Sequence, residues 1–163
     1  MNNKTKTEIL YNCAIHKETR KHLLPDLSKL CFEYLCDIKK IPLIKAIDMN
    51  DIHLLKYLIS KKIGLGKLHK LHRYNEKITA LMYAAAKGCD KCVNLLANTI
   101  ELGIQDEDGW TALMYAVRNN NVKCVKILEK TDEYYIKDNI GWSASRLADR
   151  WMDKHIVSNF PTW

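Results

Sequence analysis

The stretch DEDGWTALMYAVRNNNVKCVKIL, residues 106–128, recurs along the chain at one fixed spacing. Thirty-two residues upstream, YNEKITALMYAAAKGCDKCVNLL shares its Thr-Ala-Leu-Met-Tyr-Ala core and its later Cys-Val. Thirty-two residues downstream, DNIGWSASRLA keeps the Asp, Gly, Trp and both Ala residues. A period of this length indicates supersecondary units that bury their apolar faces by stacking on copies of themselves. The chain is therefore interpreted as a tandem array.

Each unit is predicted to contain a turn and two short helices. Asp106 and Gly109 suit a tight turn, because Asp bonds its own backbone and Gly accepts a positive φ. Thr111 stands where the hydroxyl of a helix N-cap is wanted. The asparagines at 119–121 are expected to end the first helix, and 122–128 has the apolar spacing of a second helix.

These same residues carry a family resemblance. The motif D-x-x-G-W-T-A-L-M-Y-A, followed by V-K-C-V-K-I-L, resembles the ankyrin repeat. Ala112 replaces the usual Pro, Met114 the usual His and Asn120 the usual Gly, and the period is one residue shorter than the common 33. The resemblance covers residues 38–157. The Thr-Ala-Leu-Met units also resemble those of ankyrin arrays found in protists, some of which are attached to kinase domains. This chain has no kinase signature.

The resemblance implies an all-α fold, an ankyrin-repeat solenoid of stacked helix-turn-helix units. Residues 1–37 are predicted to form an atypical helical N-terminal cap. The repeats are placed at 38–73, 74–105, 106–137 and 138–163, and polar substitutions in the last indicate a degenerate C-terminal cap. An alternative for residues 24–35 is a resemblance to the start of an F-box, which implies a ubiquitin-ligase adaptor.

The first repeat has an extended basic loop, residues 61–77. The spacing from Leu43 to its counterpart Leu81 is 38 residues rather than 32, and the surplus falls in this segment. The chain has a formal net charge of +7, and the loop supplies much of it. Its cations are Lys61, Lys62, Lys67, Lys70, Arg73 and Lys77. Two interpretations remain open, a solvated loop and a patch for an acidic partner such as nucleic acid or acidic lipid.

The cysteines bear on the compartment. The chain has six, which we interpret as reduced thiols, and we expect neither a secretory signal nor a membrane span. A cytoplasmic location is therefore expected, with a nuclear one as the alternative.

Two pairs of side chains have the spacing of a zinc site. His69 and His72, followed by Cys89 and Cys92, form an H-x₂-H and C-x₂-C arrangement. Against zinc or redox chemistry, Cys92 has a repeat counterpart in Cys124, which lacks a CxxC partner, so Cys92 is explained as a helix-packing residue. No motif for a catalytic, phosphate-binding or cofactor site was recognised. We therefore expect neither an enzyme, a metal nor a cofactor, and no small-molecule substrate.

The remaining expectation is the binding of another protein. The resemblance implies a surface formed by the hairpin tips and by the exposed edges of the first helices. By position these residues are Asn75, Glu76, Ile78, Lys87, Glu107, Asp108, Trp110, Arg118, Asn119, Asn139, Ile140, Trp142, Arg150 and Trp151. Trp and Arg anchor interfaces well. The alternative for Trp110 and Trp142 is that they only pack the hairpins together.

Overall fold

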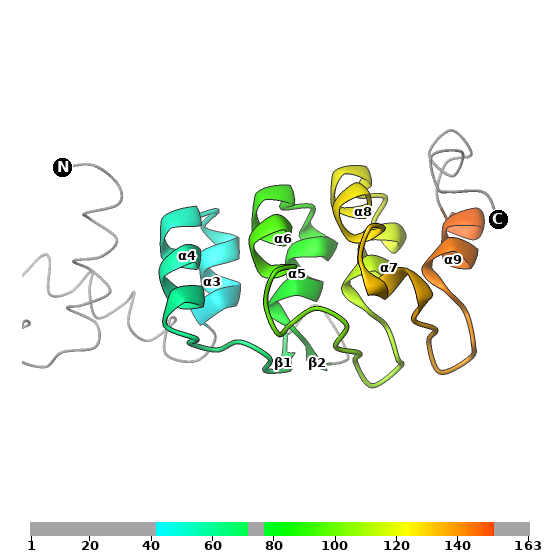
Figure 1. The fold of residues 1–163 in the computed structure, drawn as a ribbon, viewed down its shortest axis with the longest axis horizontal. Coiled ribbons are helices and arrows are strands. Elements are labelled where there is room, and N and C mark those ends of the chain that lie inside the picture. The colour runs from blue at the N-terminus through cyan, green and yellow to red at the C-terminus, as the bar shows by residue number, and fades with distance from the viewer. Residues whose placement is uncertain (1–41, 72–76, 152–163) are drawn as a thin grey trace, which may run out of the picture. The chain divides into compact units, whose positions relative to one another are not determined.

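The computed structural model describes residues 42–71 and 77–151, with Trp151 described by its backbone alone. The protein divides after Gly64 into two compact units, which we treat separately. The predicted N-terminal cap, 1–37, and the F-box-like segment, 24–35, lie outside the described residues. Both remain predictions. Figure 1 shows the helices that carry the repeats.

The first unit contains one helix pair, α3 (Pro42–Asp48) and α4 (Ile52–Ser60). Pro42 opens α3, where its missing N–H costs no helical hydrogen bond. Asp51 caps α4 by accepting a hydrogen bond from the Leu54 N–H, at 2.9 Å. The facing apolar side chains of both helices, including Leu43 and Leu58, are completely buried.

The second unit contains the quoted stretch and its neighbours. Its helices are α5 (Ala80–Lys87), α6 (Asp90–Leu96), α7 (Ala112–Arg118), α8 (Val122–Leu128) and α9 (Ala144–Trp151), with a 3₁₀ turn η2 (Asp132–Tyr135). The first helices α5, α7 and α9 pack in sequence, and α6 packs on α8 (Figure 1). The predicted helical repeat fold is confirmed.

The turns between the helices of each pair follow from the local sequence. Gly88 ends α5 with φ of 79°, and Asn120 follows α7 with φ of 56°. The Asn121 side-chain amide donates to the carbonyls of Ala85 and Ala86 in the preceding repeat, at 2.7 and 2.9 Å. The asparagines therefore end α7 as predicted, and one of them also ties two repeats together.

Buried glutamates hold the first helices. Glu133 accepts hydrogen bonds from the N–H groups of Leu113 and Gly103, at 2.7 and 2.9 Å. Its counterpart Glu101, 32 residues earlier, accepts from Leu81 and Gly66, at 2.7 and 3.1 Å. Each carboxylate thus joins the start of a first helix to the connection that precedes it. Burial raises the pKa of both acids, while the backbone donors act in the opposite direction.

The threonine cap predicted at Thr111 is not observed, whereas the equivalent Thr79 forms one. Thr79 accepts a hydrogen bond from the Met82 N–H at 3.2 Å and caps α5. Thr111 occupies the same position before α7, but its side chain makes no capping hydrogen bond. The prediction was therefore wrong in detail for Thr111. A donor in the first turn of α7, Leu113, is instead satisfied by Glu133.

The connections between helix pairs form hairpins. In the first hairpin of this unit, β1 (His69–Lys70) pairs antiparallel with β2 (Lys77–Ile78). Apart from Ile78, this short ladder lies within the segment predicted as the extended basic loop, residues 61–77. The next hairpins contain the Asp-x-x-Gly turns, in which Gly109 and Gly141 have φ of 82° and 81°.

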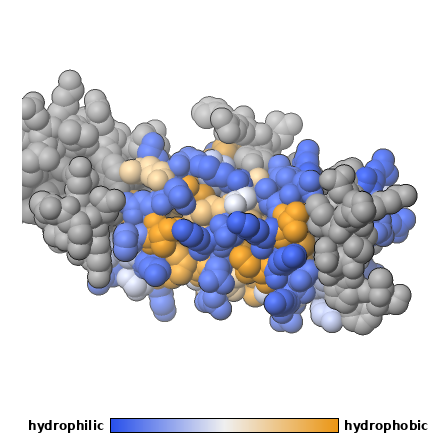
Figure 2. Space-filling view, turned by 90° about the horizontal axis from the view of Figure 1, so that it is seen from above, coloured by the Kyte–Doolittle hydropathy of each residue, from blue (hydrophilic) through white to orange (hydrophobic). Residues whose placement is uncertain are grey.

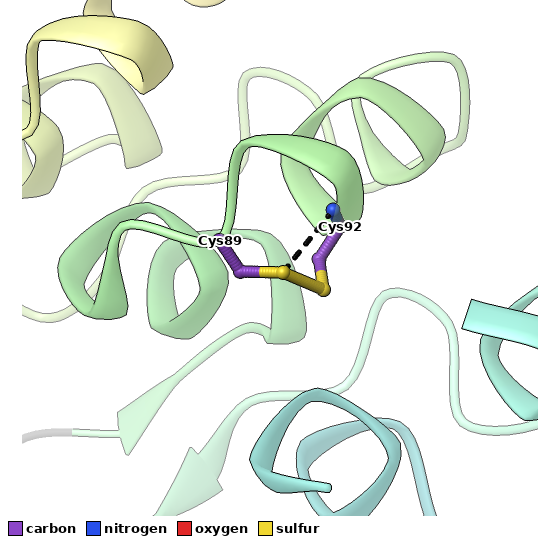
Figure 3. Close-up of a disulfide and its surroundings, with 2 residues drawn as sticks. All are labelled: Cys89 and Cys92. Carbon is purple, nitrogen blue, oxygen red and sulfur yellow. Dashed lines mark hydrogen bonds between the residues drawn. A yellow bond between two sulfur atoms is a disulfide. The ribbon is translucent and has the colours of Figure 1, made fainter. Parts of the chain in front are cut away.

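Two of the six cysteines differ from the expectation of reduced thiols. Cys89 and Cys92 form a disulfide at the start of α6, with their Cα atoms 5.2 Å apart (Figure 3). Cys89 occupies the N-cap, and one helical turn brings Cys92 within bonding reach of it. Cys124 is a buried free thiol, and desolvation raises its pKa to about 11.

Candidate functional site

Buried aspartates fix the backbone of the hairpin turns by accepting hydrogen bonds from it. Asp106 accepts hydrogen bonds from the N–H groups of Asp108 and Trp110, at 3.0 and 2.7 Å. Asp138 accepts in the same way from Ile140 and Trp142, at 3.1 and 2.7 Å. Each tryptophan therefore leaves its turn at a fixed point, as the Asp-x-x-Gly pattern predicts.

Neighbouring turns are also bonded to one another. The Asn139 N–H donates to the Asp108 carbonyl at 3.0 Å, and its side-chain amide donates to the Glu107 carbonyl at 2.9 Å. The side-chain amide of Gln105 donates to the carbonyls of Gly109 and Lys137, at 2.6 and 2.9 Å. The tips of these two repeats thus form one hydrogen-bonded ribbon.

Trp110 connects its turn to the end of the first helix. The Arg118 guanidinium lies over the Trp110 ring, 5.3 Å from its centroid. The Tyr115 ring meets the same indole edge-on at 5.6 Å, and its hydroxyl donates to Asp106 at 2.7 Å. The ring is half-buried and Arg118 is exposed. Trp110 therefore packs within its own repeat and also supports a cation at the surface.

The next repeat has the same arrangement with one more arginine. Arg150 lies over Trp142 at 5.6 Å, at the positions equivalent to Arg118 and Trp110. Arg146, one helical turn earlier on α9, lies over the same ring at 4.7 Å. Both guanidiniums belong to exposed residues, whereas the ring is half-buried. A cation–aromatic stack at a fixed repeat position is thus present in two consecutive repeats.

Most of the residues expected at the binding surface are exposed or half-buried in the second unit. They are Lys87, Glu107, Asp108, Trp110, Arg118, Asn119, Asn139, Trp142 and Arg150. Lys87 closes α5 and lies over the Tyr83 ring at 5.9 Å. Ile140, at the tip of its turn, is 74% exposed. We call this set, together with Arg146, the tip-and-edge surface.

One expected surface residue is corrected by the structure. Ile78 is 0% exposed, so it is not available to a partner. It occupies the position of Trp110 and Trp142, but its smaller side chain is covered completely, whereas the larger indoles keep part of their surface. Asn75, Glu76 and the Trp151 side chain lie outside the described residues.

The basic segment 61–77 is only partly described. Lys61 and Lys62 are exposed in the first unit, and Lys67, Lys70 and Lys77 are exposed in the second. Lys77 forms an ion pair with Glu107 of the next tip, at 3.5 Å. Arg73 lies outside the described residues. The observed ion pair gives Lys77 a partner within the chain itself.

The residues considered for zinc have other surroundings. Cys89 and Cys92 are joined by the disulfide, and His72 lies outside the described ranges. The His69 Nε2 atom is buried without a hydrogen-bond partner, and desolvation together with the Lys67 charge lowers the pKa of this histidine. Over 42–71 and 77–151, no group of three or more His, Cys, Asp or Glu side chains is placed to hold a metal ion. Over the same ranges, no helix has the length and apolarity of a membrane span.

Sequence reasoning missed three functional side chains of the second unit. Glu101 and Glu133 stand 32 residues apart, so the repeat alignment contained a signal for them, but acidic residues are usually interpreted as exposed. Arg146 is one of the polar substitutions that indicated a degenerate C-terminal cap, and it was not assigned to the binding surface. Its separation of four from Arg150 places the two on one helix face, which was the available signal.

Comparison with known proteins agrees with this architecture. A model of ankyrin repeats in three copies matches residues 43–139. No curated protein matches. One similar solved chain is from the crystal structure of the yeast ribosomal protein Rps3 in complex with its chaperone Yar1. It has a TM-score of 0.54 and 25% sequence identity, and the match covers 73% of this chain and 88% of that one. The chain belongs to the ankyrin repeat family.

Proposed function

We propose that this protein binds another protein through the tip-and-edge surface. Ankyrin repeats indicate a protein-interaction module. What we propose beyond this is the set of residues that forms the interface. The observation that carries it is the repeated stack of arginine on tryptophan, Arg118 on Trp110 and Arg150 on Trp142. Large rigid rings and forked donors are the side chains that dominate binding energy at interfaces.

The hydrogen bonds of the turns support the same proposal. Asn139 and Gln105 join the two tips by hydrogen bonds. The residues of these tips therefore lose little further freedom when a partner binds. Ile140 adds an exposed apolar side chain at one tip. The surface therefore combines an apolar contact, planar cations and a rigid backbone, which suits a specific protein partner.

The comparison with the yeast complex is consistent with this function. That structure contains a ribosomal protein together with its chaperone, and one of its chains shares the present fold. The fold therefore occurs in a complex between two proteins. This supports a binding role for the present chain and does not specify its partner.

The test uses the intact chain as bait for affinity purification with mass spectrometry. A surface variant combines Arg118→Glu, Arg150→Glu and Ile140→Ser. A matched control changes Lys123→Glu, Lys126→Glu and Ile100→Ser, which are also exposed but lie on or after second helices. We expect proteins that bind the native chain and the control but not the surface variant. Retention of every partner by a folded surface variant would show that the interface lies elsewhere.

The other two candidate functions have less support. Binding of nucleic acid or acidic lipid by the segment 61–77 rests on a charge run, and Lys77 already pairs with Glu107. The ubiquitin-ligase adaptor rests on residues 24–35, which lie outside the described part. Both remain predictions, and the same purification would reveal a ligase scaffold among the captured proteins.

A further inference from the structure

Three arginines of the tip-and-edge surface point to the chemistry of the partner. Arg118, Arg146 and Arg150 are exposed and lie on tryptophan rings. Within 42–71 and 77–151, none of the three forms an ion pair with a carboxylate. A guanidinium that lies over an aromatic ring can still bind a carboxylate in bidentate fashion, through the N–H donors in the plane of its fork.

Trp142 carries two of these cations. Arg146 and Arg150 lie 4.7 and 5.6 Å from the centroid of one ring, so two like charges are held close to the same indole. Such a pair is unfavourable by itself, although solvent screening reduces the repulsion. An anionic group bound by both forks would remove the repulsion, because it attracts each cation. The α9 end of the surface is therefore the position most suited to a carboxylate.

The repeat sets the distance between the cationic positions. Arg118 and Arg150 are equivalent residues at the ends of α7 and α9, which pack on each other. Packed helices lie about 8–10 Å apart. A peptide in the extended polyproline conformation has three residues per turn and advances about 3.1 Å per residue, so every third side chain returns to the same side after about 9 Å. A peptide lying across the helix ends would thus meet one cation at every third residue.

The tips carry the opposite charge and favour a protein over a nucleic acid. Asp108 is exposed in the turn that carries Trp110, and Glu107 beside it is exposed and ion-paired with Lys77. A nucleic acid has a negative charge at every phosphate and would place some of them against these carboxylates. A polypeptide can place acidic residues opposite the arginines and neutral ones opposite the tips. The mixed sign of the surface therefore matches a partner with patterned charge.

We propose that the partner presents an extended acidic segment, with a carboxylate at about every third residue, to Arg118 and to the Arg146–Arg150 pair. This inference rests on the proposed function and specifies the partner class for the same surface. The Trp110 and Trp142 rings hold the guanidiniums in place, so the spacing of the carboxylates matters as well as their number.

The test measures binding of labelled peptides to the full chain by fluorescence anisotropy at low ionic strength. The first peptide contains four Glu-Gly-Ser triplets. The second has the same composition with all four Glu residues at one end, and a third probe is an oligonucleotide of twelve deoxythymidines. We expect the spaced peptide to bind most tightly. Changing Arg118→Gln with Arg150→Gln should weaken it about tenfold, since two charge-assisted contacts are lost.

The matched control is Lys123→Gln with Lys126→Gln on α8, which removes the same charge from another face. An equal loss in this control would show that only net charge matters and would overturn the proposal. Equal binding of the clustered peptide, tighter binding of the oligonucleotide or binding of no peptide would also overturn it. If the purification experiment still showed partners dependent on this surface, the proposed function would stand and only the acidic segment would be rejected.

Discussion

The change Glu133→Gln tests the buried carboxylates that start the first helices. The Glu133 oxygens accept from two backbone N–H groups, at 2.7 and 2.9 Å, and the side chain is 0% exposed. Glutamine offers one carbonyl oxygen and turns an amide NH₂ toward the second donor. An unsatisfied buried donor costs about 1–3 kcal/mol. Since glutamine is neutral, it also avoids the penalty of burying a charge, which offsets part of this loss.

We therefore expect Glu133→Gln to lower the free energy of unfolding by about 1–2 kcal/mol. The assay is denaturant unfolding of the full chain followed by far-ultraviolet circular dichroism, with the m-value as a check on cooperativity. Glu101→Gln should give a similar loss because its two acceptor bonds are equivalent. Glu107→Gln, at an exposed tip, is the control and should change stability by less than about 0.5 kcal/mol. A glutamine variant as stable as the native chain would refute the reasoning.

Three further predictions concern pH, packing and thiol chemistry. Burial raises the pKa of the Glu133 carboxyl group, so this group binds a proton more tightly in the folded state than in the unfolded state. The free energy of unfolding of the native chain, relative to that of Glu133→Gln, should therefore rise as the pH is lowered from 7 toward 4.5. Denaturant unfolding at several pH values checks this. Gly88→Ala should lower the free energy of unfolding by more than about 1 kcal/mol, because φ is 79° and the new Cβ would lie 2.7 Å from the Asn121 side-chain oxygen. Gly141→Ala has a similar φ, but no atom lies within 4 Å of the new Cβ, so it should lower the free energy of unfolding by less in the same assay. Cys124 should resist alkylation at pH 8 in the native protein and react after unfolding, since it is buried and its pKa is about 11; rapid native labelling seen by mass spectrometry would contradict this.

Much of the fold could be predicted because each repeat buries the same kinds of residue at the same positions. The Asp106 turn and the break at 119–121 depend on local backbone chemistry, so the sequence alone specifies them. Glu133 could not be assigned in this way. Its burial depends on two donors that become close only after the repeats stack, and its residue type alone predicts exposure.

The candidate surface was predictable in position but not in detail. Repeat alignment placed Trp110 and Ile78 at equivalent sites, yet side-chain size left one half-exposed and buried the other. The disulfide between Cys89 and Cys92 was not predicted from the sequence, because Cys92 was explained there as a packing residue. Spacing alone does not distinguish a bonded pair from two thiols.

Hydrophilic residues surround separate hydrophobic patches on the face shown in Figure 2. The hairpin turns of the second unit lie at the lower edge of Figure 1, away from this viewpoint. Because Glu107, Asp108 and Ile140 at these tips are exposed, a change at one of them leaves the buried core intact. The bonds of Asn139 and Gln105 between adjacent turns set a limit on such changes. Loss of the Gln105 amide would remove a bridge between the two turns without removing a residue of the tip-and-edge surface. Evolution of a new target is therefore expected to vary the outward side chains and to leave Gln105 unchanged.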